Sequence, residues 1–205
     1  MAPTYKLTYF DVKALAEPIR LLFHYKNVPF EDVRVAREDW PNLKPQMPWN
    51  VMPVLEEDGK QLSQSLTIFR YLGNKFNMAG SDEFQTAKCN EYIDAMVDVR
   101  TEVTKLFREE DETKKAELKK NLKETVLPKA WKKFDDILKD NGTGVLVGKD
   151  VTYADIYIGF MTEWLSAFLE FTEIQNYTNL LAHQKKILGL PGIKEWIEKR
   201  PVTQF

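Results

Sequence analysis

The sequence predicts a fold of the α/β plus all-α class, with an α/β domain over residues 1–78 and an all-helical domain over residues 79–205. Strand-like and helix-like segments alternate in the first domain in the order βαβ followed by ββα. From Phe84 onward only helical periodicity recurs. The segment from Gly73 to Glu83 between the two patterns, with small and polar residues at 77–82, indicates a linker.

The first βαβ unit is predicted from residues 5–35. Residues 5–10 alternate and are rich in β-forming side chains, as a short strand requires. Pro18 suits the first turn of the following helix, and residues 30–35 form the second strand. We expect the two strands to be parallel, with a right-handed crossover. The prolines of residues 36–50 predict an irregular loop.

A β-hairpin is predicted next, because Asp58-Gly59 between two apolar segments favours a tight primed turn. Proline in Met52-Pro53 removes a backbone donor, and the X–Pro bond is a candidate for the cis form. Such a kink would leave the backbone of Met52 available to an extended peptide. Ser65 is predicted to cap the helix that follows the hairpin.

The second domain is predicted to consist of helices, the most apolar of which follows a capping box formed by Thr152 and Asp155. The charge run of residues 108–124 predicts a solvated turn and helix face. Asn141-Gly142 is a helix stop signal. The helical segments expected are residues 84–107, 127–138, 152–168, 178–188 and 192–199.

Composition excludes several classes of function. The 205 residues carry a net charge of −2, so neither nucleic acid nor an anionic membrane is an expected partner. No apolar run is long enough to span a membrane and the first ten residues do not resemble a signal peptide, so we expect a cytoplasmic protein. Cys89 and two histidines predict no disulfide and no metal site. Cys89 itself is expected to be an inert packing residue.

Several motifs together resemble the sigma-class glutathione transferases, most closely the arthropod enzymes, which include cockroach allergens. They are YKLTYF at 5–10, AEPIR at 16–20, EDWP at 38–41, LKP at 43–45, MPVL at 52–55, DGK at 58–60, Gln64-Ser65, Thr152-x-Ala154-Asp155 and KRP at 199–201. The resemblance covers essentially the whole chain. It implies a thioredoxin-like N-terminal domain, an all-helical C-terminal domain, a homodimer, and glutathione as co-substrate with no metal.

The resemblance assigns Tyr9 as the hydroxyl that donates a hydrogen bond to the glutathione sulfur. Physical chemistry supports this role, because a thiol with a pKa near 8.5 is mostly protonated at neutral pH and only the thiolate is a good nucleophile. A charge-assisted hydrogen bond lowers that pKa. The alternative is that Tyr9 is only a strand-end aromatic residue whose hydroxyl is satisfied within the protein.

The other glutathione contacts are likewise implied by the resemblance. Trp40 and Lys44 would bind the glycyl carboxylate, although they could instead be loop core and a surface lysine. Met52 and Pro53 would present backbone to the cysteinyl unit, and Gln64 and Ser65 would hold the γ-glutamyl carboxylate. An acidic residue of the partner subunit would reach the γ-glutamyl amine, and the candidates are Asp98 and Glu102, which could also be an exposed helix face.

The electrophile pocket is implied by position, with ordinary core packing as the alternative for each residue. It would comprise Phe10, Val12, Ala14, Arg100, Tyr157, Met161 and Phe205. Two residues depart from the vertebrate prostaglandin D isomerases of this class. Leu15 stands where those enzymes have an arginine, and Glu109 stands near their pocket tryptophan.

The expected function is conjugation of glutathione to small apolar electrophiles, together with reduction of lipid hydroperoxides, in detoxification. Three alternatives remain: a prostaglandin D isomerase, a non-catalytic protein of the lens crystallin type, and a carrier of apolar ligands. The two departures count against the isomerase. The crystallins of this descent typically carry a long insertion in the helical domain, which this sequence lacks.

Overall fold

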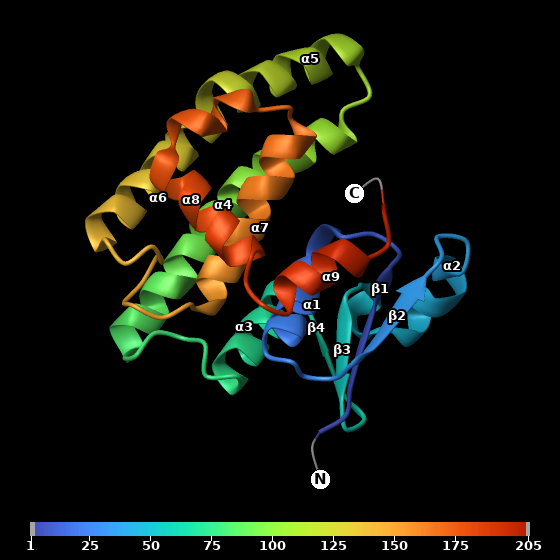
Figure 1. Ribbon diagram of the computed structural model, residues 1–205. Coiled ribbons are helices and arrows are strands. Elements are labelled where there is room, and N and C mark those ends of the chain that lie inside the picture. Colours follow the sequence, from blue (N-terminus) through green and yellow to red (C-terminus); the bar gives the residue numbers. More distant parts are fainter. Residues whose placement is uncertain (1–2, 204–205) are drawn as a thin grey trace. The chain divides into compact units, whose positions relative to one another are not determined.

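The computed structural model describes residues 3–203, which form two compact units (Figure 1). Unit 1 contains residues 3–78 together with residues 189–203, and unit 2 contains residues 79–188. The predicted fold class is confirmed, because unit 1 combines a sheet with helices and unit 2 is helical. The last helix, which the sequence placed with the helical domain, groups instead with unit 1.

Unit 1 is built on one four-stranded sheet with the strand order β2-β1-β3-β4. Its elements are β1 (Tyr5–Phe10), η1 (Ala14–Ala16), α1 (Glu17–Tyr25), β2 (Glu31–Val35), α2 (Trp40–Leu43), η2 (Lys44–Gln46), η3 (Pro48–Asn50), β3 (Val54–Glu57), β4 (Lys60–Ser63), α3 (Ser65–Lys75) and α9 (Ile193–Lys199). β1 and β2 are parallel, whereas β3 is antiparallel to both β1 and β4. The βαβ unit and the hairpin are therefore both confirmed.

The local sequence explains these elements. α1 begins with Pro18 in its first turn and buries Ile19, Leu22 and Phe23 completely, and it packs beside α3. The hairpin turn Asp58-Gly59 has φ values of 48° and 81°, which is the left-handed geometry of a two-residue primed turn.

The predicted irregular loop of residues 36–50 is wrong in part, because the chain forms three short helical segments there: α2, η2 and η3. Only η3 departs from helical backbone angles, since Trp49 inside it has φ of 56°. Each contains a proline in its first two positions: Pro41, Pro45 and Pro48. Proline fixes φ near the helical value and lacks an N–H that the first turn does not need. The proline density therefore starts helical turns in this segment.

Helix α9 belongs to unit 1 because it packs against α1 (Figure 1). The Trp196 ring stacks on the His24 ring, with centroids 4.3 Å apart and planes 15° apart. Gly192, the residue before α9, has φ of 81°, and a Cβ atom there would collide with the backbone carbonyl of His24. Glycine therefore permits the close approach of the two helices.

Unit 2 is helical, as predicted. Its elements are α4 (Glu83–Arg108), α5 (Glu112–Asn121), η4 (Leu122–Val126), α6 (Leu127–Asn141), α7 (Tyr153–Phe168), η5 (Thr172–Asn176) and α8 (Thr178–Leu188). α5, η4 and α6 follow one another without a break. η4 is a π-helical turn just before Pro128, because proline lacks the N–H that an α-helical hydrogen bond would need there. α6 ends at Gly142, which has φ of 69°.

α7 is the buried helix of unit 2 and packs against α4 and α8. The predicted capping box is confirmed: the Thr152 backbone N–H and hydroxyl both donate to Asp155 Oδ2, at 2.8 and 2.7 Å. Asp155 Oδ1 also accepts from the Leu146 N–H at 2.7 Å and lies 2.9 Å from His183 Nε2. This fully buried carboxylate therefore joins the start of α7 to the preceding loop and to α8.

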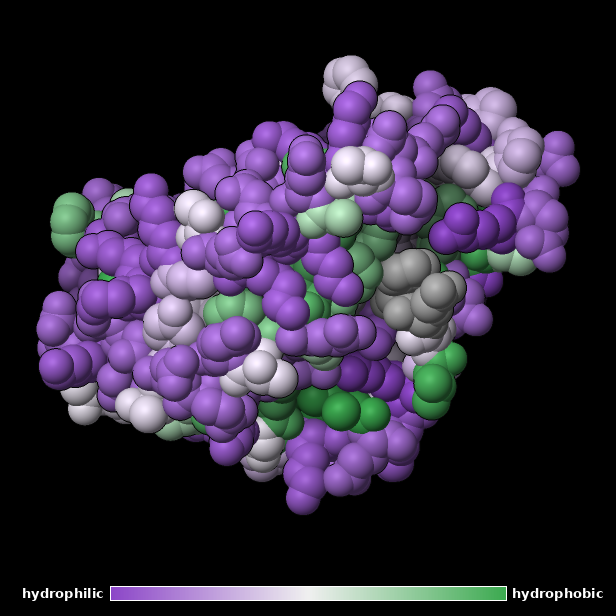
Figure 2. Space-filling view, turned by 90° about the horizontal axis from the view of Figure 1, so that it is seen from above, coloured by the Kyte–Doolittle hydropathy of each residue, from purple (hydrophilic) through white to green (hydrophobic). Residues whose placement is uncertain are grey.

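Hydrophilic residues cover most of the face shown in Figure 2, where apolar residues gather in separate patches. Among residues 3–203, no helix is both long enough and apolar enough to cross a membrane.

Candidate active site

Tyr9 lies near the end of β1, beside the start of β3. The two strands are antiparallel and pair Thr8 with Val54, so the next residue on β1, Tyr9, lies beside Pro53. The Met52-Pro53 peptide bond, a candidate for the cis form in the sequence, is cis, and both residues are buried. The Tyr9 side chain is 6% exposed.

Gln64 and Ser65 lie at the same end of the sheet, where β4 passes into α3. β3 and β4 are antiparallel and pair Val54 with Ser63, the last residue of β4. The next residue, Gln64, therefore lies opposite Pro53, the residue before β3. The predicted cap is wrong: Ser65 is the first residue of α3, and the cap position belongs to Gln64. Within the described chain no side chain forms a capping hydrogen bond here, so the backbone N–H groups of the first turn can bind a carboxylate.

The backbone of Gln64 is strained. Its φ of 72° and ψ of 109° lie in a region that non-glycine residues rarely adopt, at a cost of about 1–3 kcal/mol. Such strain gathers at binding sites, where it sets the direction of backbone groups. The glutamine itself gives no hint of this geometry in the sequence.

Trp40 and Lys44 extend the site beyond β2, which ends level with β1 because Phe10 pairs with Val35. The Phe10 ring contacts the Tyr9 ring at 5.7 Å and the Trp40 ring at 5.6 Å between centroids. Three aromatic rings therefore run from Tyr9 to the start of α2. Lys44 is the first residue of η2 and its side chain is exposed.

These groups suit an extended peptide with a carboxylate at each end. The start of α3 can take one carboxylate through its N–H groups and dipole, and the Lys44 ammonium can take the other. Backbone at Met52 can pair with the middle of such a peptide, and the Tyr9 hydroxyl can donate to a sulfur anion there.

Comparison with known proteins shows the family of the chain. The family models described as "Glutathione S-transferase, N-terminal domain" and "Glutathione S-transferase, C-terminal domain" match residues 5–74 and 97–200. A glutathione S-transferase of Anopheles gambiae is 38% identical over 202 residues, which are 98% of this chain and 99% of the mosquito protein. The chain belongs to the glutathione S-transferase family. It is an enzyme.

Two solved structures extend the comparison of this transferase. A structure described as prostaglandin synthase D of Nilaparvata lugens is 43% identical, with a TM-score of 0.90, covering 98% of this chain and 100% of that one. Na-GST-3 of the hookworm Necator americanus, described as monomeric, is 34% identical, with a TM-score of 0.89 and the same coverage.

The residues expected to bind the electrophile are distributed over both units of the transferase. The half-buried residues in unit 1, at or just after the end of β1, are Phe10, Val12 and Ala14. Those in unit 2 are Arg100 on α4, which is half-buried, and Tyr157 and Met161 one turn apart on α7, which are 2% and 3% exposed. Phe205 lies outside the described residues. Within residues 3–203 no three His, Cys, Asp or Glu side chains gather as they would around a metal ion.

The two residues that depart from the prostaglandin isomerases have definite surroundings. Leu15 is half-buried in η1. Glu109 follows α4, and its Oε1 accepts hydrogen bonds from the backbone N–H groups of Glu110 and Asp111, each at 3.0 Å. The Glu109 carboxylate therefore stabilises the turn between α4 and α5.

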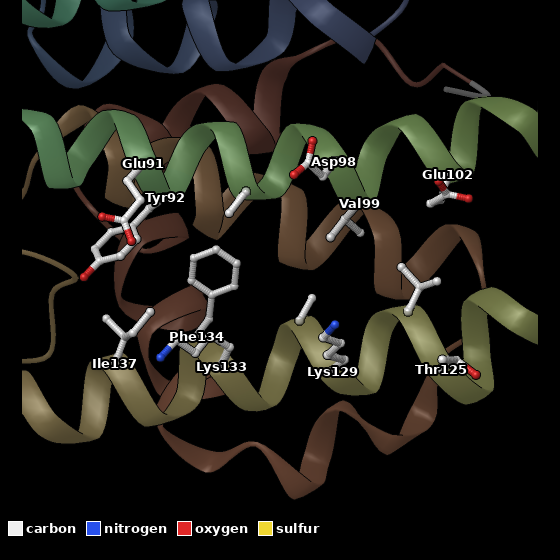
Figure 3. A pocket seen from close by; sticks show the side chains of 13 residues that line it. Glu91, Tyr92, Asp98, Val99, Glu102, Thr125, Lys129, Lys133, Phe134 and Ile137 are labelled. Carbon is white, nitrogen blue, oxygen red and sulfur yellow. The ribbon is translucent and has the colours of Figure 1, made fainter.

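Asp98 and Glu102, the candidates for the acidic group given to a partner subunit, both line a groove of about 490 Å³ between α4 and α6 (Figure 3). The α4 side carries Glu91, Asp98 and Glu102, and the α6 side carries Lys129 and Lys133. Apolar side chains lie between these rows: Tyr92, Ala95, Val99, Val126, Ala130, Phe134 and Ile137. Glu102 also pairs with Lys105, whose Nζ lies 2.7 Å from both carboxylate oxygens.

Cys89 and Trp49 differ sharply in their exposure to solvent. Cys89 is fully buried, and burial raises the pKa of its thiol, as expected of a packing residue. Trp49, which the sequence analysis did not single out, is 82% exposed and is the most exposed aromatic residue among those described. Its position between Pro48 and Asn50 gives no functional signal in the sequence.

Proposed function

We propose that this transferase is a sigma-class enzyme that conjugates glutathione to small apolar electrophiles in detoxification. One observation carries the proposal: the register of the sheet brings the end of β1, the start of β3 and the start of α3 to one edge. Three groups therefore lie at the same end of the sheet: the hydroxyl of Tyr9, the backbone of Met52 and the strained helix start at Gln64.

In the proposed reaction, the Tyr9 hydroxyl donates a hydrogen bond to the sulfur of bound glutathione. The bond favours the ionised form, so the thiol loses its proton to solvent more readily. The thiolate then attacks the electrophilic carbon, and a carbon–sulfur bond forms as the leaving group or π electrons of the electrophile depart. Tyr9 remains a hydrogen-bond donor throughout and is not itself consumed.

The two ends of glutathione are proposed to bind away from the sulfur. The first turn of α3, with Gln64 and Ser65, holds the γ-glutamyl carboxylate, and Lys44 with the Trp40 indole N–H holds the glycyl carboxylate. The backbone of Met52 pairs with the cysteinyl unit, beside Pro53. These contacts position the thiol without taking part in its ionisation.

The electrophile is proposed to contact the end of β1 through Phe10, Val12 and Ala14. Arg100, Tyr157 and Met161 contribute from unit 2, and Phe205 completes the set. Apart from Arg100 these side chains are apolar or aromatic, which favours small apolar electrophiles such as lipid-derived enals. Reduction of lipid hydroperoxides uses the same thiolate and is proposed as a second activity.

Prostaglandin D synthesis is the second candidate function, because the planthopper structure that resembles this chain bears that description. Leu15 and Glu109 count against it. Leucine supplies no positive charge near a thiolate, and the Glu109 carboxylate would repel a fatty-acid carboxylate. We therefore rank conjugation first.

A substrate panel tests this choice. Turnover of an aryl halide, 4-hydroxynonenal, cumene hydroperoxide and prostaglandin H2 would be compared at fixed glutathione concentration. We expect conjugation or peroxide reduction to exceed isomerisation. Glutathione binding without turnover of any of the four would instead favour a ligand carrier or a crystallin-like role.

We also propose that the transferase forms a homodimer through the groove between α4 and α6. Its acidic row on α4 and basic row on α6 are complementary, so a two-fold axis can place each row opposite its counterpart in a second copy. The apolar residues between the rows would lose water on association. In such a dimer Glu102 or Asp98 would serve the partner's glutathione site.

The oligomeric state tests the dimer. Light scattering after size-exclusion chromatography is expected to give the mass of two chains. Reversing two charges, with K129E and K133E together, is expected to produce monomers, whereas K139E on the same helix but outside the groove is expected not to. A monomeric wild-type protein, as described for the hookworm relative, would overturn the proposal.

A further inference from the structure

A cluster of six alternating charges lies beside the loop that follows Tyr9. Its carboxylates are Asp11, Glu17 and Asp32, and its guanidinium groups are Arg20, Arg34 and Arg200. We call these six residues the α1–α9 ion cluster. The equal numbers of each sign allow every member at least one partner of opposite charge.

The centre of the cluster is deeply buried. Arg20 is fully buried and Glu17 is 1% exposed. Arg20 Nη1 lies 3.3 Å from Glu17 Oε2, and Arg20 Nε donates to Asp32 Oδ1 at 3.0 Å. Buried ion pairs add little net stability because desolvation offsets their attraction. A cluster placed here is therefore better explained by the geometry that it imposes.

One end of the cluster holds the loop that follows Tyr9. Arg20 Nη1 donates to the carbonyl oxygen of Val12 at 2.8 Å, and Arg34 Nη1 donates to Asp11 Oδ1 at 2.8 Å. Arg34 is also the residue that pairs with Tyr9 across the parallel strands β1 and β2. Arg20 thus holds the backbone at Val12, and Arg34 holds the side chain of Asp11, both within three residues of the proposed thiolate donor.

The other end of the cluster holds α9 and the residue after it. Glu17 Oε1 accepts hydrogen bonds from Trp196 Nε1 and from Arg200 Nη1, each at 2.9 Å. The Arg34 guanidinium carbon also lies 5.8 Å from the centre of the Trp196 ring. The same network therefore contacts both the Tyr9 loop and the C-terminal helix.

We propose that the α1–α9 ion cluster couples α9 to the Tyr9 loop, with Glu17 and Arg20 as positioning residues for the thiolate hydrogen bond. The inference rests on the proposed role of Tyr9. When α9 is in place, Trp196 and Arg200 fix the Glu17 carboxylate, which orients Arg20 and through it the Val12 carbonyl. When these contacts are lost, the Glu17 carboxylate still faces Arg20 but is no longer fixed from the α9 side, so Arg20, the Val12 carbonyl and the Tyr9 hydroxyl are held less firmly.

The test changes the α9 end of the cluster, because removing Glu17 or Arg20 would leave a buried charge without its partner and could prevent folding. R200Q removes one donor to Glu17, and W196F removes the other while keeping an aromatic ring on His24. The matched control is K194Q with E198Q, which removes an exposed ion pair of 4.0 Å on the same helix. Tm would be recorded for every variant.

The decisive readout is the pKa of the thiol of enzyme-bound glutathione, followed by ultraviolet absorbance of the thiolate. We expect this pKa to rise in the double variant W196F/R200Q, less in R200Q alone, and not in the control. We expect kcat/KM at neutral pH to fall between about 2- and 30-fold, the range typical of residues that couple sites without touching the ligand. The KM for glutathione should change less than kcat.

A double variant with lowered Tm but an unchanged thiol pKa would overturn the inference, because the cluster would then only attach α9. The variant Y9F separates this failure from failure of the proposed function. If Y9F raises the thiol pKa and the double variant does not, only the coupling is wrong. If Y9F leaves the thiol pKa unchanged, the role of Tyr9 is wrong and the coupling falls with it.

Discussion

Replacing Tyr9 by phenylalanine removes one oxygen atom and tests the central chemical assignment. The Tyr9 ring is 6% exposed and contacts the Phe10 ring, so a phenylalanine ring is expected to keep its place, and water would not readily replace the lost hydroxyl. A hydrogen bond to a charged group contributes about 1.5–3 kcal/mol. At 1.36 kcal/mol per pKa unit, its loss raises the pKa of the bound thiol by about one to two units.

The expected consequence is a 10- to 100-fold fall in conjugation rate at neutral pH, because the thiolate fraction falls by about that factor. Glutathione affinity should stay within a few-fold, since the ends of the peptide are bound elsewhere. Thiolate absorbance titrated against pH measures the first effect, and steady-state conjugation of an aryl halide measures the second. A variant that titrates and turns over like the wild type would refute the assignment.

The remaining predictions concern binding, specificity, stability and reactivity. Ser65→Ala and Lys44→Ala should raise the KM for glutathione more than they lower kcat, because both groups bind the peptide far from sulfur; a large loss of kcat at unchanged KM would contradict this. Turnover of prostaglandin H2 should be lower than that of hydroperoxides and enals, and the reverse order would show that the two departures from the isomerases were misjudged. Asp155→Ala should lower the free energy of unfolding by about 3–5 kcal/mol, measured in urea, because it leaves buried donors unpaired; a loss below about 1 kcal/mol would contradict this. Cys89 should react with a thiol reagent much more slowly in the folded protein than in urea, because burial disfavours its thiolate; equal rates would show that it is accessible.

Local signals explain why most of the fold could be predicted from the sequence. The turn at Asp58-Gly59 and the capping box at Asp155 depend on residues close together in the chain, and both were confirmed. The short helical turns of residues 40–50 were missed because proline marks both loops and helix starts. The position of α9 was missed because it depends on Glu17, far away in the sequence.

The candidate site was predicted less completely. Tyr9 and Ser65 could be named from a family resemblance. The resemblance does not give the strand register and backbone angles that bring them to the same end of the sheet. The strained backbone of Gln64 arises where a strand passes directly into a helix, and a glutamine in the sequence does not indicate this backbone geometry. The ion cluster around Arg20 joins residues from three separate segments, so no sequence pattern could reveal it.

The attachment of α9 to unit 1 has a consequence for the folding of the protein during its synthesis on the ribosome. Synthesis proceeds from the N-terminus, and domains generally fold as units while the chain emerges. Unit 1 is split, however: its first 78 residues are made early, whereas Trp196 and Arg200 come almost last. Until then the Glu17 carboxylate lacks two of its hydrogen-bond donors. Unit 1 therefore cannot form all of its native contacts until unit 2 has been translated.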